Sequence, residues 1–147
     1  MTKRKTQGQR RKRSKGNSYQ VFVSHATLDK WIAKTICEKI ESVGATTFRD
    51  DRDIDGGDDI PESIKTAIQR SSEFVVLITP TSWDRAWVLI EVGVAWGWPS
   101  EIRIVPILYH VETDRIPPII KQKKAYTLND FDDYLKELAK RVKEKHV

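Results

Sequence analysis

Short apolar runs alternate with longer amphipathic stretches along most of the chain. Runs rich in β-branched and aromatic residues are typical of buried strands, and we expect five of them, at 19–24, 45–50, 73–80, 102–109 and 124–126. Apolar residues at helical spacing predict helices between and after these strands, at 28–44, 60–71, 83–98 and 130–146. The order of the elements therefore alternates between strand and helix.

This alternation predicts a single α/β domain, a doubly wound sheet of five parallel strands. If the strand order is the flavodoxin-like 2-1-3-4-5, a ligand crevice opens at the carboxyl ends of strands one and three. Ser24 and His25 end the first of these strands, and Thr79 and Pro80 end the third. We expect the functional site there.

The helical spacing also predicts which side chains lie inward. For the helix at 28–44 the inward positions are Leu28, Trp31, Ile32, Thr35, Ile36 and Ile40. The single Cys37 falls at a helical apolar position and is expected to be a core thiol, and Gly44 supplies the stop. In the fourth strand, Pro106 indicates a position toward the sheet edge or a bulge.

The positive charge of the chain is concentrated at its N-terminus. Residues 1–15 carry eight Lys and Arg side chains and no acid, so the net charge of +5 leaves −3 for residues 16–147. Because residues 1–18 contain no apolar side chain except Met1, we expect a disordered basic tail. Such a tail touches nucleic acid weakly if at all, and its commoner role is a solvated arm.

Composition excludes several classes of protein. The chain has no apolar run long enough to cross a bilayer and no signal-peptide pattern, and one cysteine cannot form an internal disulfide or a zinc set. We therefore expect a cytoplasmic protein without membrane contact. The chain also lacks a GxGxxG motif and a P-loop.

Two motif readings fail on their context. The loop residues Asp51, Asp53, Asp55, Gly56 and Glu62 match the spacing of an EF-hand calcium loop. The segment before them is strand-like, however, and Pro61 crowds the exit, so we expect no metal site. A response-regulator receiver would need an acidic pair after strand one and an Asp after strand three, where this chain has Ser24-His25 and Thr79-Pro80.

Glu91 is the clearest candidate for chemistry. It is the only ionisable side chain between Ala86 and Ser100, a run that contains three tryptophans. A carboxylate in such surroundings is costly to desolvate, so it is paired, exposed or used. The alternative to a functional acid is an aromatic core stripe, with Trp83 and Trp87 on the helical face of Glu91 and Glu91 at its rim.

Three segments in order resemble a TIR (Toll/interleukin-1 receptor) domain of the prokaryotic kind. They are YQVFVSH, FRDDRDIDGGDDI, and FVVLITP followed by SWDRAWVLIEVGVAW. They match the first-strand box, the BB loop, and the strand and helix with the WxxxE motif, and the resemblance covers about residues 19–145. It implies a basic tail at 1–18 followed by a TIR domain at 19–147.

The resemblance implies an NAD+ glycohydrolase whose catalytic glutamate is Glu91, with NAD+ as substrate and no cofactor. It implies that the NAD+ site is bordered by Ser24, His25, Ala26, Thr27, Asp50, Asp55 and Trp87. Water as acceptor gives ADP-ribose, whereas an internal adenine or ribose atom gives a cyclic isomer. With no fused effector or sensor, the expected setting is bacterial antiphage defence, with a downstream effector that senses the product.

Two other functions stay open. Many TIR domains self-associate through the BB loop and neighbouring helices, and some are interaction modules without enzymatic activity. A protein that binds nucleic acid through the tail is the third possibility, and its binding would fall steeply with salt.

Overall fold

The computed structural model describes most of the domain. The described residues are 18–50, 61–82, 88, 91, 93–95, 102–112, 114, 116, 121 and 123–145. The basic tail at 1–17 and the calcium-like loop at 51–60 lie outside them.

The described residues form one five-stranded parallel sheet in the order β2-β1-β3-β4-β5. The strands are β1 (Gln20–Ser24), β2 (Thr46–Arg49), β3 (Glu73–Ile78), β4 (Arg103–Leu108) and β5 (Tyr126–Thr127). This order is the predicted flavodoxin-like one, so the expected fold class is confirmed. The winding reverses between β1 and β3, which pair directly, with Ser24 opposite Val76.

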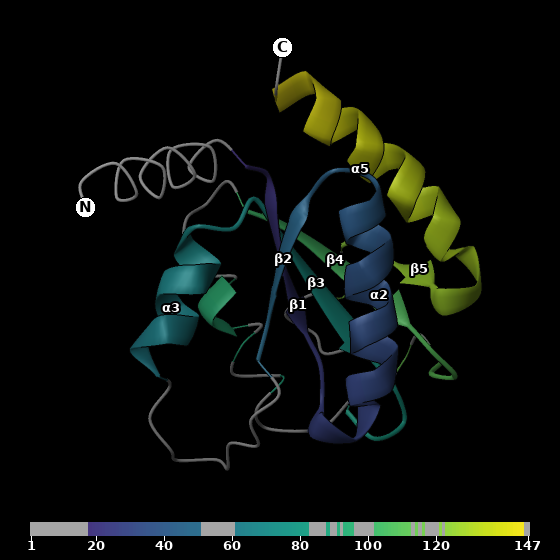
Figure 1. Ribbon diagram of the computed structural model, residues 1–147. Helices are drawn as coiled ribbons and strands as arrows, with labels where there is room; N and C mark the ends of the chain where they lie inside the picture. The colour runs from purple at the N-terminus through teal and green to yellow at the C-terminus, as the bar shows by residue number, and fades with distance from the viewer. Residues whose placement is uncertain are drawn as a thin grey trace.

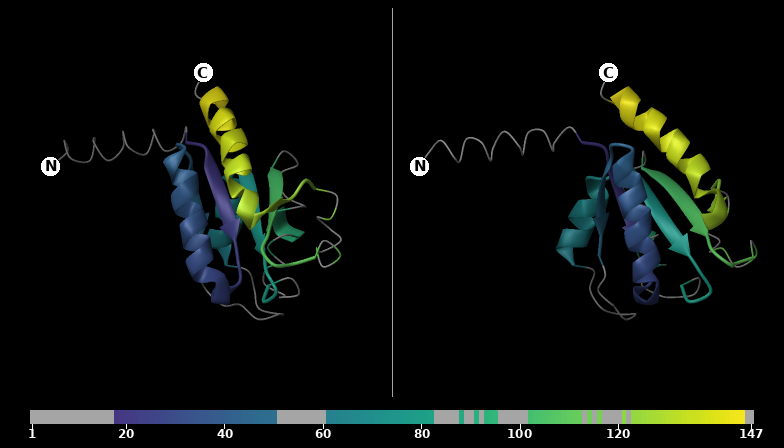
Figure 2. Two further views of the ribbon diagram at one scale, coloured as in Figure 1. Left: turned by 90° about the vertical axis from the view of Figure 1, so that its right-hand side faces the viewer. Right: turned by 45° about the vertical axis from the view of Figure 1, so that its right-hand side comes forward.

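The helices lie on both faces of the sheet. They are α2 (Lys30–Ser42), α3 (Glu62–Gln69) and α5 (Phe131–Lys145), and the short 3₁₀ turns η1 (Thr27–Asp29) and η4 (Leu128–Asp130) precede α2 and α5. Figure 1 shows α3 apart from α2, and Figure 2 shows α2 next to α5. Residues 88, 91 and 93–95 are also helical, as the sequence predicts for that segment.

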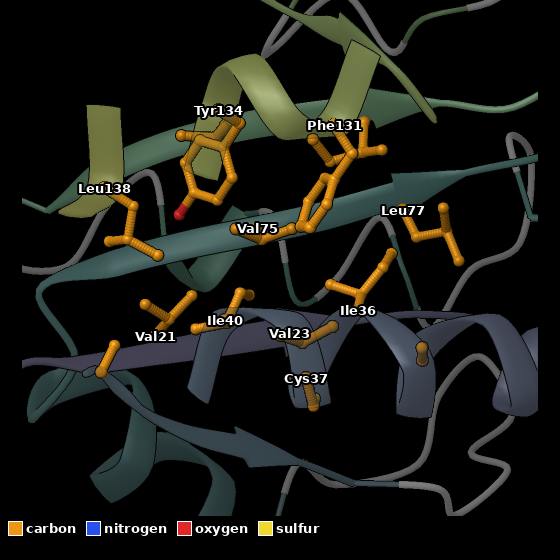
Figure 3. Close-up of a cluster of buried hydrophobic side chains, with 14 of the residues drawn as sticks. Val21, Val23, Ile36, Cys37, Ile40, Val75, Leu77, Phe131, Tyr134 and Leu138 are labelled. Carbon is orange, nitrogen blue, oxygen red and sulfur yellow. The ribbon is translucent and has the colours of Figure 1, made fainter. Parts of the chain in front are cut away.

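Alternate residues of each strand face opposite layers, so the sheet divides the core in two. Val21, Val23 and Val75 pack with the buried faces of α2 and α5 (Figure 3). Phe22 and Phe74 point the other way, toward α3, and their rings stack with centroids 5.1 Å apart. Burial of both faces explains why these strands are apolar throughout rather than alternating.

For the helix predicted at 28–44, the prediction of which residues face inward is wrong near its start. Leu28 is 74% and Trp31 76% exposed, whereas Ile36, Cys37 and Ile40 are buried as predicted. Residues 27–29 form a 3₁₀ turn rather than the first turn of the helix, so the helical phase does not extend back to Leu28. Trp31 lies within α2, but its spacing puts it on the side of the helix opposite to Ile36 and Ile40. Gly44 ends the helix as predicted, with φ at +102°.

The last strand differs slightly from its prediction. β5 covers Tyr126–Thr127 rather than 124–126 and pairs with β4 only at Ile107 and Leu108. Pro106 faces Val76 of β3 in an unbroken register, so β4 carries no bulge there. Pro106 therefore lies in the part of β4 that β5 does not cover, which agrees with a position toward the sheet edge.

A buried carboxylate joins β3 to α5 at the amino end of the sheet. Glu73 is fully buried and accepts hydrogen bonds from Tyr19 Oη at 2.5 Å and Tyr134 Oη at 2.7 Å. Arg141 adds its Nε at 2.5 Å and a second guanidinium nitrogen at 3.2 Å. Burial, and next the neighbouring Glu73, raise the pKa of both tyrosines, so they stay protonated as donors to Glu73.

In the part of the chain that the structure describes, no helix is both long and apolar enough to cross a membrane. Cys37 is a buried thiol in the hydrophobic core, as predicted.

Candidate active site

Ser24 and Glu91 meet at the carboxyl edge of the sheet. Ser24 is the last residue of β1, and its Oγ donates a hydrogen bond of 2.8 Å to Glu91 Oε1. Glu91 comes from the helical segment that follows β3 and is only 2% exposed. This is the edge, between β1 and β3, where the strand order predicts a ligand site.

The surroundings of Glu91 disfavour its ionised form. Burial raises the pKa of Glu91 well above its usual range, the hydrogen bond from Ser24 lowers it, and the negative charge of Asp50 raises it again. Desolvation dominates because a single hydroxyl donor does not replace the water that a carboxylate loses. The sequence left three options for this acid: paired, exposed or used in function. Because Glu91 is buried, the structure excludes the exposed position at the rim.

The segment after β1 folds tightly against the turn after β3. Asp29 Oδ2, in η1, accepts hydrogen bonds from Thr79 Oγ1 at 2.6 Å and from Thr81 Oγ1 at 3.1 Å. Ser82 Oγ accepts from the backbone N–H of Thr79 at 2.8 Å and donates to the Leu77 carbonyl at 3.1 Å. These contacts hold η1, which follows β1, against the turn that follows β3.

Asp29 and Ser82 were missed as supporting residues by the sequence interpretation. A Thr-Pro-Thr-Ser run directly after a buried strand is a polar turn sequence, and hydroxyl side chains often bond to the backbone there. The partner Asp29 is 50 residues from Thr79 along the chain, so no local pattern could identify it.

The other predicted site residues are placed as follows. His25 and Ala26 are buried directly after Ser24, and Thr27 is half-buried. Thr27 Oγ1 is buried without a hydrogen-bond partner among the described residues. Asp50, directly after β2, is half-buried and close enough to raise the pKa of Glu91.

Asp55 and Trp87, the two remaining predicted site residues, lie outside the described residues. The described part of the chain holds no group of three or more His, Cys, Asp and Glu side chains arranged to bind a metal ion.

Comparison with known proteins identifies the family. The family model for the TIR domain matches residues 21–141. A Brachypodium distachyon protein named "Probable 2' cyclic ADP-D-ribose synthase BdTIR" is 23% identical over 120 residues, which are 79% of this chain and 53% of that protein. A "Stimulator of interferon genes protein" of Magallana gigas is 28% identical over 131 residues, 83% of this chain and 32% of that protein. The chain thus spans about half of one curated relative and about a third of the other.

Solved structures agree with the fold. A metazoan TIR-STING receptor from C. gigas, in complex with 2',3'-cGAMP, superposes with a TM-score of 0.66 at 27% identity, over 82% of this chain and 39% of that one. The TIR domain of the Toll-related receptor TRR-2 from Hydra magnipapillata gives 0.62 at 23% identity, over 82% of this chain and 98% of that one. With its predicted strand order and a match to the family model over residues 21–141, the chain belongs to the TIR domain family.

Proposed function

We propose that this TIR domain cleaves the bond between nicotinamide and ribose in NAD+. The observation that carries the proposal is the buried carboxyl of Glu91, held by Ser24 at the edge where β1 and β3 end. A buried acid with an anionic neighbour is unfavourable for stability, and such groups concentrate at functional sites.

One carboxylate suffices for this reaction. The pyridinium nitrogen takes the electron pair of the broken C–N bond, so nicotinamide leaves as a neutral molecule and needs no acid catalyst. Positive charge develops on the ribose ring as that bond breaks. A carboxylate in a water-poor site stabilises this charge strongly. The two-carboxylate arrangement of ordinary glycosidases is therefore unnecessary.

The substrate itself favours the ionised form of Glu91. In the unliganded site, desolvation raises the pKa of this carboxyl. A nicotinamide ring in the crevice brings a positive charge, which offsets that desolvation and lowers the pKa. Ser24 holds one carboxyl oxygen and so orients the group toward the crevice.

The acceptor determines the product. Water adds its oxygen to the ribose carbon and releases a proton, which gives ADP-ribose. An internal hydroxyl or adenine nitrogen in place of water gives a cyclic isomer. The relative from Brachypodium distachyon, named as a probable 2' cyclic ADP-D-ribose synthase, supports the general reaction and makes cyclisation a product to look for.

The remaining site assignments belong to the same proposal. Thr27 Oγ1 is a buried hydroxyl available to a ribose hydroxyl, and His25, Ala26 and Asp50 border the same crevice. We assign Asp55 and Trp87 to the NAD+ site from their motif positions alone, with Trp87 as a stacking surface. NAD+ is the substrate, and the reaction requires no cofactor or metal.

The proposed setting is signalling within the cytoplasm of a bacterium under phage attack. There the domain would self-associate, and a downstream effector would sense the nucleotide product or respond to the loss of NAD+. This setting is proposed from the resemblance to prokaryotic TIR domains.

The test is NAD+ consumption by the purified protein, with products separated by chromatography and mass. We expect Glu91→Gln and Glu91→Ala to reduce nicotinamide release by about 100-fold or more, the size of losses when a main electrostatic stabiliser is removed. Glu38→Gln, an exposed acid on α2, is the matched control and keeps full activity. An active Glu91→Gln variant would refute the assignment of Glu91.

A non-enzymatic interaction module is the second candidate. Leu28 and Trp31 are exposed beside an apolar cavity of about 220 Å³ that is lined by Ile32, Tyr109, Leu128 and Phe131, among others. Exposed apolar patches mark interaction surfaces. If the wild type releases no nicotinamide at high concentration but self-associates, and Trp31→Ala prevents the association, this second function replaces the first.

A further inference from the structure

A second cavity lies at the opposite edge of the sheet from Glu91. Its volume is about 660 Å³. Tyr19 and Arg103 line it at the amino ends of β1 and β4, whereas Ser24 and Thr79 lie at the carboxyl ends. The described residues that line it are Tyr19, Gln69, Ser71, Ser72, 102–105, Lys123, Lys124, Tyr126, Tyr134, Glu137 and Arg141.

The lining is rich in positive charge. Lys123, Lys124, Arg103 and Arg141 contribute cations, and Glu137 is the only acid among the lining residues that the structure describes. Glu73 lies buried behind Arg141 and neutralises it. Lys124 is 3.6 Å from Glu137, so this acid neutralises it.

Arg103 is the cation best placed to bind a ligand. It is exposed at the start of β4, and its guanidinium has no ion pair or hydrogen bond with any residue that the structure describes. Arg141, by contrast, is already occupied by two hydrogen bonds to Glu73. A planar guanidinium without a partner matches a phosphate through two parallel hydrogen bonds.

The rest of the lining offers hydroxyl and aromatic groups. Ser72 Oγ makes no hydrogen bond within the described residues, and Lys124 lies 5.2 Å from the centre of the Tyr126 ring. The volume far exceeds that of an isolated phosphate ion and falls within the range of about 300–1,000 Å³ for small-molecule sites.

We propose that this cavity binds a phosphate monoester of mononucleotide size, with Arg103 pairing the phosphate. The planar guanidinium of Arg103 can pair with a phosphate monoester, which carries a charge of about −1.5 to −2 at neutral pH. The nucleoside part lies over the Tyr126 side of the cavity. This site is separate from the Glu91 crevice and does not depend on the activity proposed for it.

The experiment is calorimetric titration of the full chain with AMP at physiological salt, beside adenosine and inorganic phosphate. We expect AMP to bind more tightly than either part alone. Arg103→Glu reverses the charge of an exposed residue and weakens AMP binding by about tenfold or more. Lys34→Glu, an exposed cation on α2, is the matched control and changes the affinity by less than about twofold.

Three results would overturn the site. The first is wild-type protein that does not bind AMP at millimolar concentration. The second is AMP binding that Arg103→Glu leaves unchanged. The basic tail is present in both proteins, so such binding would belong to the tail or to another site rather than to the cavity. The third is binding lost in Glu91→Gln, which would place AMP in the crevice instead. Thermal melts of each variant establish that it is folded.

Discussion

Among the described residues two glutamates are buried, and their partners separate their roles. Glu73 accepts hydrogen bonds from two tyrosines and from two nitrogens of Arg141, which is the full pairing that a structural carboxylate needs. For Glu91 the described residues supply a hydrogen bond from Ser24 and the negative charge of Asp50. Glu91 is therefore the functional candidate of the two.

The pKa of Glu91 leads to a stability prediction that is independent of catalysis. Its pKa in the folded state lies above its value of about 4.3 in the unfolded chain. Between these two values the folded state holds a proton that the unfolded state has lost. The free energy of unfolding therefore falls as pH rises through this window.

We accordingly expect Glu91→Gln to stabilise the free protein at pH 8 by on the order of 1 to 3 kcal/mol, because the amide removes the cost of a buried charge. The gain should shrink as pH falls from the folded-state pKa toward about 4.3, because the folded state is then protonated and the unfolded state also binds the proton near 4.3. Urea unfolding at pH 5 and pH 8 measures it, with Glu38→Gln as an exposed control. An equal effect of Glu91→Gln at both pH values would contradict the proposed cause.

At the scale of the element, α2 shows how helical phase determines which residues are buried. Ile36 and Ile40 pack against β1 and β3, but Trp31 faces solvent because its spacing puts it on the opposite side of α2. The exposed tryptophan contributes little to folding by itself.

Substitutions on the two sides of α2 test this geometry. Ile36→Ala leaves a cavity in the core and is expected to lower the free energy of unfolding by about 2–5 kcal/mol. Trp31→Ala changes an exposed side chain and should stay within about 0.5 kcal/mol of wild type. Urea unfolding measures both, and a large loss for Trp31→Ala would mean that this face is covered by a partner or a different fold.

The hydrogen-bonded contact between α5 and β3 depends on Glu73. Glu73→Ala leaves a largely buried guanidinium and two tyrosine hydroxyls without their acceptor, which should cost about 3–5 kcal/mol. Glu137→Ala is the matched control, because Glu137 also faces Arg141 but is more exposed, and surface pairs contribute about 0–1 kcal/mol. Equal losses for the two variants in urea unfolding would show that the contact between these elements does not depend on Glu73.

For the molecule as a whole, the tail and the domain are predicted to act independently. Residues 18–145 contain the whole described sheet, and the eight cations of residues 1–15 precede it. Removing residues 1–17 should leave the melting temperature unchanged and abolish weak binding to a labelled DNA duplex. Fluorescence anisotropy measures that binding. The logarithm of the binding constant should fall with the logarithm of the salt concentration, with a slope of about −0.9 per phosphate contacted. Duplex binding by the truncated chain would contradict this and favour a nucleic-acid site on the domain.

The sequence by itself predicted the five strands and the helices between them, because strand burial and helix phase depend on neighbouring residues. Three motifs in order gave the resemblance to the TIR family, and with it the flavodoxin-like strand order. Glu91 was its candidate acid and stays a prediction. The predicted start of α2 was wrong, since a 3₁₀ turn and an α-helical turn have nearly the same apolar pattern.

Only the tertiary structure brought Ser24 to Glu91, Asp29 to Thr79, and Glu73 to Tyr134 and Arg141, pairs that are 50 to 68 residues apart. Hydrogen bonds and charge interactions depend on distance in space, which local sequence patterns do not contain. For the same reason, the cationic cavity at the amino edge of the sheet became visible only in the folded chain.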